Sequence, residues 1–506
     1  MRSFNFLRKN QENLFFIFFI FLLIFLKRFE LKYYSNERDV LPYAYSVFNK
    51  NWLPNDWYLS LKIQYRYLFS YAVGFLVQCF GFLKAAFLGR ISSYILFSYA
   101  FVKLIRSIGI NSKIALGLFT LYITAFFGGM GGAKEWMIGG LETKVFAYPL
   151  VLLSLAYVIE KKISKSLFFA GLSFSLHLLV GGYYSFCIGV VLIFQLLKGE
   201  CQFVKILKAI PFYLFSATFG LYGVFINFTT PQLSEGWNIY VNYRVAHHTL
   251  PLWETSVFVL FGLFTLINFI LFFLSKNKIV KSISIFNLSN SFVTIVGLFI
   301  YFFGNQLLLR YYFFRFSDAL LPLLTILNLY FFLQSKYTIT STIKNTVLGF
   351  FLTLFFLTNF DRVKILFTPS YYINISERSS FNVEMSSWIK ENTSKHDVFI
   401  VSPTLSNFQV STERSVFVTL KSSPQASKDL IEWHKRIRLL INKPLVYQDF
   451  KASYQLVKDS YKQITTDDII KIKEQYPELT YLCISSAVDL DFEIAYQVGK
   501  FKLYKL

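Results

Sequence analysis

The sequence predicts a mainly α-helical, polytopic membrane protein with about eleven transmembrane helices plus juxtamembrane helices, followed by a C-terminal extracytoplasmic α/β domain. Hydrophobic residues make up 55% of the 506 residues and charged residues only 16%, against roughly 25% charged in a soluble domain. Apolar runs that suit a ~30 Å hydrocarbon layer recur through residues 1–360. Lysine and arginine gather in short clusters between these runs, which is the topology signal of a membrane protein.

The high positive charge does not indicate a nucleic-acid partner. The formal charge is +22, but we find no basic helix face or nucleic-acid-binding motif. We therefore predict a lipid bilayer as the partner and no nucleic acid. The four cysteines form no CxxC pair, which argues against a disulfide framework and a structural zinc site.

The first span is predicted from a basic N-terminus and an apolar run over residues 13–26 without a small-residue cleavage site. The N-terminus is then cytoplasmic, and a long first external loop covers 27–89. Within it, residues 67–88 are apolar. If this stretch spanned the membrane, Arg106 and Lys113 would lie outside, against the charge rule. We therefore expect an interfacial or re-entrant helix there.

The later spans follow from apolar runs separated by lysine-rich loops. They are expected at about 91–105, 114–127, 144–159, 166–197 (two spans), 209–228, 252–274, 285–303, 316–334 and 345–360. Residues 1–360 thus form the predicted transmembrane domain, and the charge rule places the rest of the chain outside the cytoplasm.

Residues 361–506 have the pattern of an α/β domain. Short β-branched or aromatic runs at 398–402, 415–420 and 479–484 predict strands. Amphipathic patterns at 424–441 and 453–461 predict helices. A hairpin around 499–500 is expected to pair 492–498 with 501–506.

On this topology, many polar side chains fall on the external face. Such groups are costly near hydrocarbon, so their first interpretation is functional. The candidate site residues are Glu37, Asp39, Glu142, Lys144, Arg244, His247, His248, Arg315 and Asp318.

Several candidates have a simpler structural interpretation. Asp39 could cap the helix that follows it, and for Asp56 a turn or cap is the favoured interpretation. Glu142 and Lys144 could pair with each other, although a spacing of two places them on different helix faces. Arg315 and Asp318, three apart, could form a helical ion pair. His177, predicted inside a span, could be an interior histidine or a site residue.

The segment Arg244-Val-Ala-His-His248 is more informative. One cation and two imidazoles in a short external loop suit an anionic ligand such as phosphate. Zinc is an alternative, but the spacing matches no standard zinc pattern.

The order of features in the first loop resembles the GT-C superfamily, which includes the protein O-mannosyltransferases, the aminoarabinose transferase and the oligosaccharyltransferase catalytic subunit. The resemblance rests on Asp39, Tyr43, an apolar helix ending at Phe80-Gly81, and Arg90. Later stretches resemble an uncharacterised bacterial membrane family with the same pattern; they are 134–142, 244–248, 314–318 and 433–436. One departure is Val40, because the mannosyltransferases often have Asp-Glu at the first site. Glu37 is the candidate substitute.

The resemblance implies a glycosyltransferase in a bacterial inner membrane that uses a polyprenyl-phosphate sugar donor. Asp39, with Glu37, would be catalytic and would accept or orient the acceptor's proton. Arg244, His247 and Arg315 would hold the phosphate leaving group. Glu142 would bind a sugar hydroxyl or a divalent metal, for which Asp39 is the other available carboxylate. The alternatives are a lipid or polysaccharide transporter or flippase and a non-catalytic membrane assembly protein.

Overall fold

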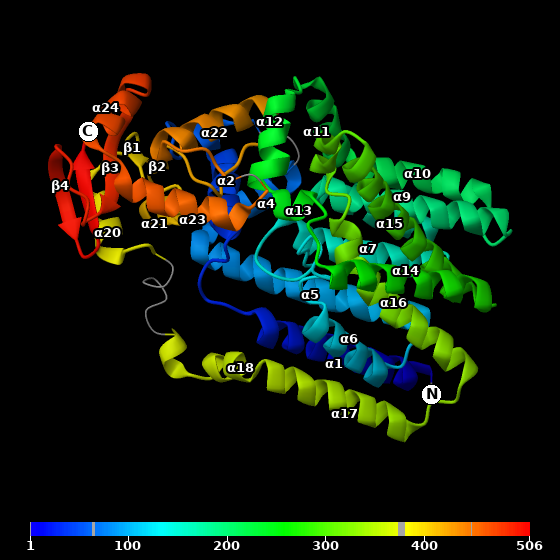
Figure 1. The fold of residues 1–506 in the computed structure, drawn as a ribbon. Coiled ribbons are helices and arrows are strands. Elements are labelled where there is room, and N and C mark those ends of the chain that lie inside the picture. Colours follow the sequence, from blue (N-terminus) through cyan, green and yellow to red (C-terminus); the bar gives the residue numbers. More distant parts are fainter. Residues whose placement is uncertain (1, 63–65, 373–379, 447) are drawn as a thin grey trace.

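A computed structural model of the chain describes residues 2–62, 66–372, 380–446 and 448–506. Long helices make up most of the molecule, and a small sheet with its helices lies at one end (Figure 1). The N-terminus lies at the far end of the long helices, away from this sheet. The predicted class, a helical domain followed by an α/β domain, is therefore confirmed.

Each predicted span coincides with an apolar helix or helix pair. The long apolar helices are α1 (Arg2–Arg28), α5 (Phe82–Ile108), α6 (Ser112–Ala125), α7 (Thr143–Ile159), α8 (Ile163–Leu176), α9 (Leu178–Leu197), α10 (Phe203–Ser216), α11 (Thr218–Thr229), α14 (Thr255–Leu274), α15 (Lys278–Phe303), α16 (Arg315–Lys336) and α17 (Ser341–Thr358). Among the described residues, six of these helices pass a length and hydropathy test for a membrane span, and α10 with α11, bent by 69°, would make a seventh. The count of eleven stays a prediction, because α6, α7 and α8 are shorter and α1 is not among the helices that pass.

The apolar stretch after residue 66 forms a short helix and then the start of a long one. Helix α4 (Tyr67–Phe80) has 14 residues, roughly 20 Å at the usual rise, which is less than the ~30 Å core of a bilayer. The chain turns at Gly81, whose φ of 74° favours glycine. Helix α5 then begins at Phe82, earlier than the predicted start near 91. The short α4 suits the interfacial helix that we expected, whereas 82–89 belong to α5 and not to a loop.

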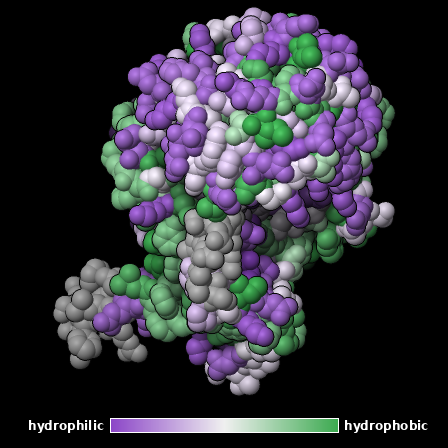
Figure 2. Space-filling model, turned by 90° about the vertical axis from the view of Figure 1, so that its left-hand side faces the viewer, coloured by the Kyte–Doolittle hydropathy of each residue, from purple (hydrophilic) through white to green (hydrophobic). Residues whose placement is uncertain are grey.

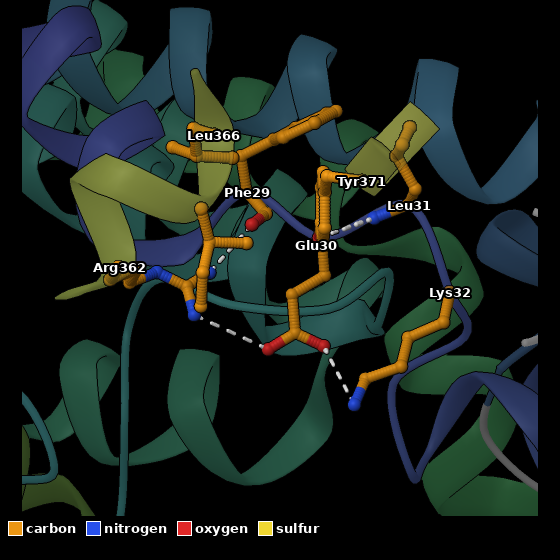
Figure 3. A pocket seen from close by; sticks show the side chains of 8 residues that line it. Phe29, Glu30, Leu31, Lys32, Arg362, Leu366 and Tyr371 are labelled. Atoms are coloured by element: carbon orange, nitrogen blue, oxygen red, sulfur yellow. Dashed lines mark hydrogen bonds and ion pairs between the residues drawn. The ribbon is translucent and has the colours of Figure 1, made fainter. Parts of the chain in front are cut away.

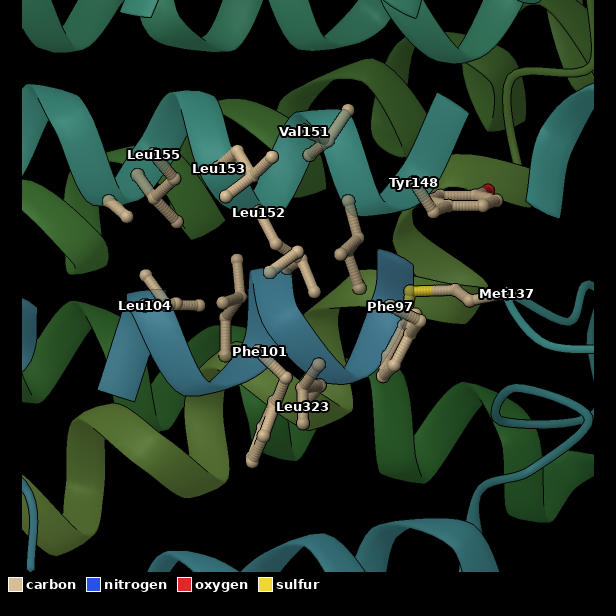
Figure 4. Close-up of a cluster of buried hydrophobic side chains, with 14 of the residues drawn as sticks. Phe97, Phe101, Leu104, Met137, Tyr148, Val151, Leu152, Leu153, Leu155 and Leu323 are labelled. Atoms are coloured by element: carbon tan, nitrogen blue, oxygen red, sulfur yellow. The ribbon is translucent and has the colours of Figure 1, made fainter. Parts of the chain in front are cut away.

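Helices α5 and α7 form the centre of the membrane domain (Figure 4). Leu104 of α5 points toward α7, and Leu152 and Leu155 of α7 point toward α5, whereas Phe101 points to the other side of α5, next to Leu323 of α16. All of these side chains are buried. The close packing fixes the ends of three helices that carry polar residues.

The loops predicted to be cytoplasmic lie together. Glu160 after α7 pairs with Lys103 near the end of α5 and with Lys162. Glu200 after α9 pairs with Lys161 and with Lys278 at the start of α15. Four loops distant in sequence thus share one end of the helices, as the alternating topology requires.

Shorter elements cover the other end. They are α2 (Glu37–Phe48), α3 (Trp57–Ser60), α12 (Ser234–Ile239), the π-helix η1 (Tyr240–Arg244), α13 (Ala246–Thr249) and the 3₁₀-helix η2 (Gln306–Tyr311). After α17, the chain continues through α18 (Phe360–Leu366) and η3 (Pro369–Tyr372).

The C-terminal domain is a mixed five-stranded sheet in the order β2-β1-β3-β5-β4. Strands β1, β2 and β3 are parallel, and β5 pairs antiparallel with β3 and β4. The elements are α20 (Val383–Asn392), β1 (Val398–Ile400), α21 (Phe408–Thr412), β2 (Ser415–Val416), α22 (Ser427–Ile441), α23 (Phe450–Ser460), η4 (Tyr461–Gln463), α24 (Thr466–Gln475), β3 (Leu479–Ser485), β4 (Glu493–Val498) and β5 (Phe501–Lys505). The α/β layer therefore begins after the predicted boundary at 361, which falls in α18. The face that this domain presents in Figure 2 is mostly hydrophilic.

A buried aspartate joins the first loop to this domain. Asp56 caps α3 by accepting from the Leu59 amide at 3.0 Å, as its cap interpretation predicted. Its second oxygen accepts from the Val416 amide of β2 and the Gln409 side chain of α21, at 3.0 and 2.7 Å. Because Asp56 is fully buried, these bonds tie the domain to the membrane part.

Candidate functional site

The glycine-rich segment 128–142, between α6 and α7, is the centre of the polar face. Side chains from α2, α7, α13 and α16 all bond to it. The predicted external loops therefore converge in space, as the charge pattern indicated.

Glu135 is the hub of this segment, and it accepts from three side chains. Its carboxylate forms an ion pair with Arg315, whose Nε lies 2.5 Å away. It also accepts from Lys144 at 3.3 Å and from the Tyr148 hydroxyl at 3.2 Å. Burial alone would raise the pKa of Glu135, but Arg315 and Lys144 hold it below its usual value. The charge is thus kept on Glu135 by its two cationic partners.

Asp318 shapes the same segment. Its carboxylate accepts from the backbone amides of Gly132, Ala133 and Glu135, at 3.1, 3.2 and 3.0 Å. It does not form the helical ion pair with Arg315 that the spacing allowed, because both side chains turn toward the segment. Gly129, with φ of 76°, leaves no room for a Cβ, which would lie 2.5 Å from the Asp318 carboxylate. Asp318 therefore holds the backbone that presents Glu135.

Glu37 is held in a buried ion pair. Its two oxygens accept from Arg90 Nε and Nη2 at 2.6 and 2.5 Å, and it also accepts from the backbone amides of Leu141 and Tyr34. With both partners buried, this geometry positions α2 against α5 and the glycine-rich segment. Glu37 is thus occupied by structural contacts.

Asp39 lies in the first turn of α2. The residue before this helix, Asn36, forms no side-chain cap, and Asp39 is not at the cap position. The Tyr58 hydroxyl is bonded to the Asp39 carboxylate, and burial and this carboxylate raise the pKa of Tyr58 well above its usual value. Among the described residues, Oδ1 of Asp39 is buried and has no hydrogen-bond partner. One oxygen is therefore available to a proton donor from outside the chain.

Glu142 connects the two parts of the site. It accepts from the Asn36 side chain at the start of α2, and one oxygen lies 3.9 Å from the Lys144 ammonium. Lys144 is buried, lies closer to Glu135, and stacks 3.8 Å from the Trp136 ring centre. The simple Glu142–Lys144 pair is therefore part of a larger chain of charges that runs from Arg315 to the helix of Asp39.

His247 and His248 are half-buried and pack against each other, with ring centres 4.0 Å apart. The Nδ1 atom of His248 lies 2.6 Å from the Ala133 carbonyl oxygen. Burial and the nearby Arg244 and Lys134 lower the pKa of His247 to about 4, and burial and Arg315 lower that of His248 far below its usual value. Both imidazoles are thus neutral near pH 7 and add no positive charge for an anion.

Arg244 forms a hydrogen bond to the C-terminal domain. Its Nη2 donates to the Lys421 carbonyl oxygen at 2.9 Å. Burial and Arg244 lower the pKa of Lys421 to about 8. The second cation beside Arg244 therefore comes from the C-terminal domain, which the sequence pattern did not suggest.

A cavity of about 460 Å³ opens next to Arg315. It is lined by the break between α8 and α9, the end of α11, α12, η2 and residues 424–425 of the C-terminal domain. Arg310 lies in its wall, stacked 4.4 Å from the Trp237 ring centre. His177, which we expected inside a span, is at the break between α8 and α9 and lines this cavity.

An apolar groove of about 470 Å³ adjoins the cavity. Both are lined by Leu178, Leu179 and Tyr311. The groove runs between α9 and α15, over Tyr183, Phe186 and Phe292 among others. A cationic, aromatic chamber thus opens onto an apolar surface of membrane helices.

A separate cavity of about 220 Å³ lies where α1 meets α18 (Figure 3). Glu30 forms ion pairs there with Arg362 and Lys32. The Tyr371 hydroxyl accepts from the Leu31 amide at 3.3 Å. These contacts fasten the chain after α17 to the end of α1, and none of the candidate site residues lines this cavity.

Within the described ranges, no group of three or more histidine, cysteine, aspartate or glutamate side chains gathers in a way that suits a metal ion. A divalent metal ion held by Glu142 and Asp39 remains a prediction from the sequence.

Comparison with known proteins gives a fold but no family for the whole chain. Residues 382–440 match a family described as a domain of unknown function (DUF6798). No curated protein matches significantly. ArnT from Cupriavidus metallidurans, solved with bound undecaprenyl phosphate, is similar in structure, with a TM-score of 0.50 and 10% identity over 97% of each chain. Its apo state gives 0.43 and 9% identity over 98% of each chain.

The oligosaccharyltransferase of Archaeoglobus fulgidus tethered to an acceptor peptide gives a TM-score of 0.45 at 10% identity, over 94% of this chain and 69% of that one. The likeness to ArnT over nearly the full length shows that the two chains share a fold, as the sequence resemblance predicted. Six helices among the described residues are long and apolar enough to cross a membrane, so the chain is an integral membrane protein.

Proposed function

We propose that this protein is a glycosyltransferase that moves a sugar from a polyprenyl-phosphate-linked donor to an acceptor on the extracytoplasmic face of a bacterial inner membrane. The observation that carries the proposal is the chamber with Arg310 and Arg315, which is continuous with the apolar groove along α9 and α15. A phosphate attached to a long hydrocarbon chain has the same division into a charged head and an apolar tail. Guanidinium groups bind phosphate well because their donors form a planar fork.

A series of ion pairs and one hydrogen bond connects the proposed phosphate site at Arg315 to the helix of Asp39. Arg315, Glu135, Lys144, Glu142 and Asn36 are linked in that order, and Asn36 directly precedes α2. A donor held at Arg315 could therefore present its sugar toward the α2 helix. Glu142, whose side chain is only 13% exposed, is the proposed partner of a sugar hydroxyl.

The reaction needs one proton acceptor and one stabilised leaving group. The acceptor hydroxyl attacks the anomeric carbon, the bond from that carbon to the phosphate oxygen breaks, and polyprenyl phosphate leaves with the electron pair. Asp39, whose Oδ1 has no partner among the described residues, takes or orients the hydroxyl proton. Arg310 and Arg315 stabilise the negative charge that grows on the phosphate. Glu37 positions α2 through Arg90.

The purified protein in liposomes, supplied with a polyprenyl-phosphate sugar labelled in the sugar, tests the proposal. A transferase releases unlabelled polyprenyl phosphate and moves the label to an acceptor extract. A flippase instead moves the intact donor across the bilayer and releases no polyprenyl phosphate. The second result, or neither result with any polyprenyl donor, would overturn the proposal.

A further inference from the structure

Residues 419–427, which follow β2 and end at the first residue of α22, form a strap that reaches from the C-terminal domain over the polar face. Pro424 and Gln425 line the same cavity as Arg315. The Ser427 hydroxyl accepts from the Leu233 amide at 2.8 Å and donates to the Pro231 carbonyl at 3.2 Å. The strap is therefore part of the chamber wall and is bonded to the loop before α12.

The membrane domain sets the position of this strap. Arg244 donates to the Lys421 carbonyl oxygen. A Cβ on Gly236 of α12 would lie 1.9 Å from the Ser427 carbonyl oxygen, so the two backbones touch with no space between them. Within the strap, the Ser422 amide donates to Thr419 Oγ1. Trp433 of α22 donates its Nε1–H to the Thr419 carbonyl oxygen. A side chain on the strap is thus held at a fixed place above the site.

Lys421 is the cationic side chain that the strap adds to the polar face. It is half-buried and forms no ion pair within the part of the chain that the structure describes. The charged residues that shift the pKa of Lys421 are Arg244, Glu142, Asp39 and Lys144. Arg244, which donates to the Lys421 backbone, and Lys421 therefore bring two cations to the polar face, next to the two neutral histidines of α13.

We propose that Lys421 is a substrate-binding residue, which holds an oxyanion of the substrate beside Asp39, so that the C-terminal domain completes the site. The inference rests on the proposed function and deepens it. A half-buried ammonium beside a guanidinium is stabilised when an anion joins them, and bonds from an ammonium to phosphate or carboxylate are charge-assisted. The oxyanion is either the phosphate of the lipid donor or an acidic group on the acceptor.

Binding measurements separate these sources without requiring turnover. The parent, Lys421→Met, Lys421→Arg and Lys428→Met are purified and titrated with polyprenyl phosphate and with inorganic phosphate. Lys428 is the matched control, because it is an exposed lysine on the same stretch of chain. We expect Lys421→Met to weaken binding of at least one probe by about 10- to 100-fold, and Lys421→Arg and Lys428→Met to stay within about 3-fold of the parent.

The pattern of loss identifies the source of the anion. Weaker binding of polyprenyl phosphate assigns Lys421 to the donor, whereas weaker binding of inorganic phosphate alone assigns it to an acidic group of the acceptor. Unchanged binding of both probes by Lys421→Met, or an equal loss in Lys428→Met, would overturn the inference. Because no turnover is measured, a parent that binds these probes but transfers no sugar would refute the proposed function alone.

Discussion

At the scale of single residues, the polar face is a set of buried charges that neutralise one another. Glu37 and Arg90 form one unit, and Glu135 with Arg315 and Lys144 forms a second. Removing one partner from such a unit costs about 3–5 kcal/mol, because the other charge stays buried. These units therefore fix the segments that carry Asp39 and Glu142, which are less fully paired.

The pH dependence of anion binding should report Lys421. Its pKa is lowered to about 8 by burial and Arg244, with Glu142 and Asp39 acting in the opposite direction and Lys144 in the same one. The ammonium is charged below that value and loses its charge as the pH rises through it. A phosphate monoester is already fully ionised there, since its second pKa is near 6.

We therefore expect the affinity for the probe that Lys421 binds to fall between pH 7 and 9, and to stay level in Lys421→Arg. Titration of both proteins at several pH values checks this expectation. An equal fall in the two proteins would assign the titration to another group.

Some of these residues could be predicted from sequence, and others could not. Asp39, Glu142, Arg244 and Arg315 stood out because a charged group at the edge of an apolar run is costly. The role of Glu135 depends on a partner 180 positions away. Lys421 is likewise distant from Arg244 in the sequence, and only folding brings the two together. The sequence also predicted that His247 and His248 help to bind an anion, whereas burial lowers the pKa of both and keeps them neutral.

At the scale of elements, the docking of α12 on α22 should be sensitive to one methyl group. Gly236→Ala places a Cβ where the Ser427 carbonyl oxygen lies, so the helix and the strap have to separate. In Gly262→Ala, on α14, the added Cβ meets no atom within 4 Å. We expect protease applied to membranes to release the C-terminal domain faster from Gly236→Ala than from the parent, and at the parent rate from Gly262→Ala. Equal rates in all three proteins would mean that this contact does not hold the domain.

Apolar runs predicted the long helices well because the bilayer leaves few alternatives to a helix. The strands β1, β3, β4 and β5 lay where β-branched and aromatic runs indicated. Helices α20, α21 and α24 were not predicted. They are short, and the contacts that bury their apolar residues come from parts of the chain distant in sequence. The early start of α5 was also missed, because no residue type marks the turn at Gly81 in advance.

At the scale of the whole molecule, one end carries the lysine-rich loops and the other carries the site and the α/β domain. The charge rule assigns the first end to the cytoplasm. In protein lacking the exposed Cys79, Lys84→Cys should react with a membrane-impermeant maleimide in intact cells, because it is exposed at the start of α5. Lys198→Cys, exposed after α9 at the opposite end, should react only after permeabilisation. The reverse pattern would place the site in the cytoplasm.

Transfer of labelled sugar by Asp39→Asn tests the central claim most directly. Asparagine keeps the size of the side chain but cannot accept the hydroxyl proton, and a general base contributes about 10²–10⁴-fold to a rate. We predict that Asp39→Asn is as stable as the parent in a thermal unfolding assay, binds polyprenyl phosphate normally, and releases it from the sugar donor at least ~10²-fold more slowly. A stable Asp39→Asn protein that transfers sugar at the parent rate would contradict this account.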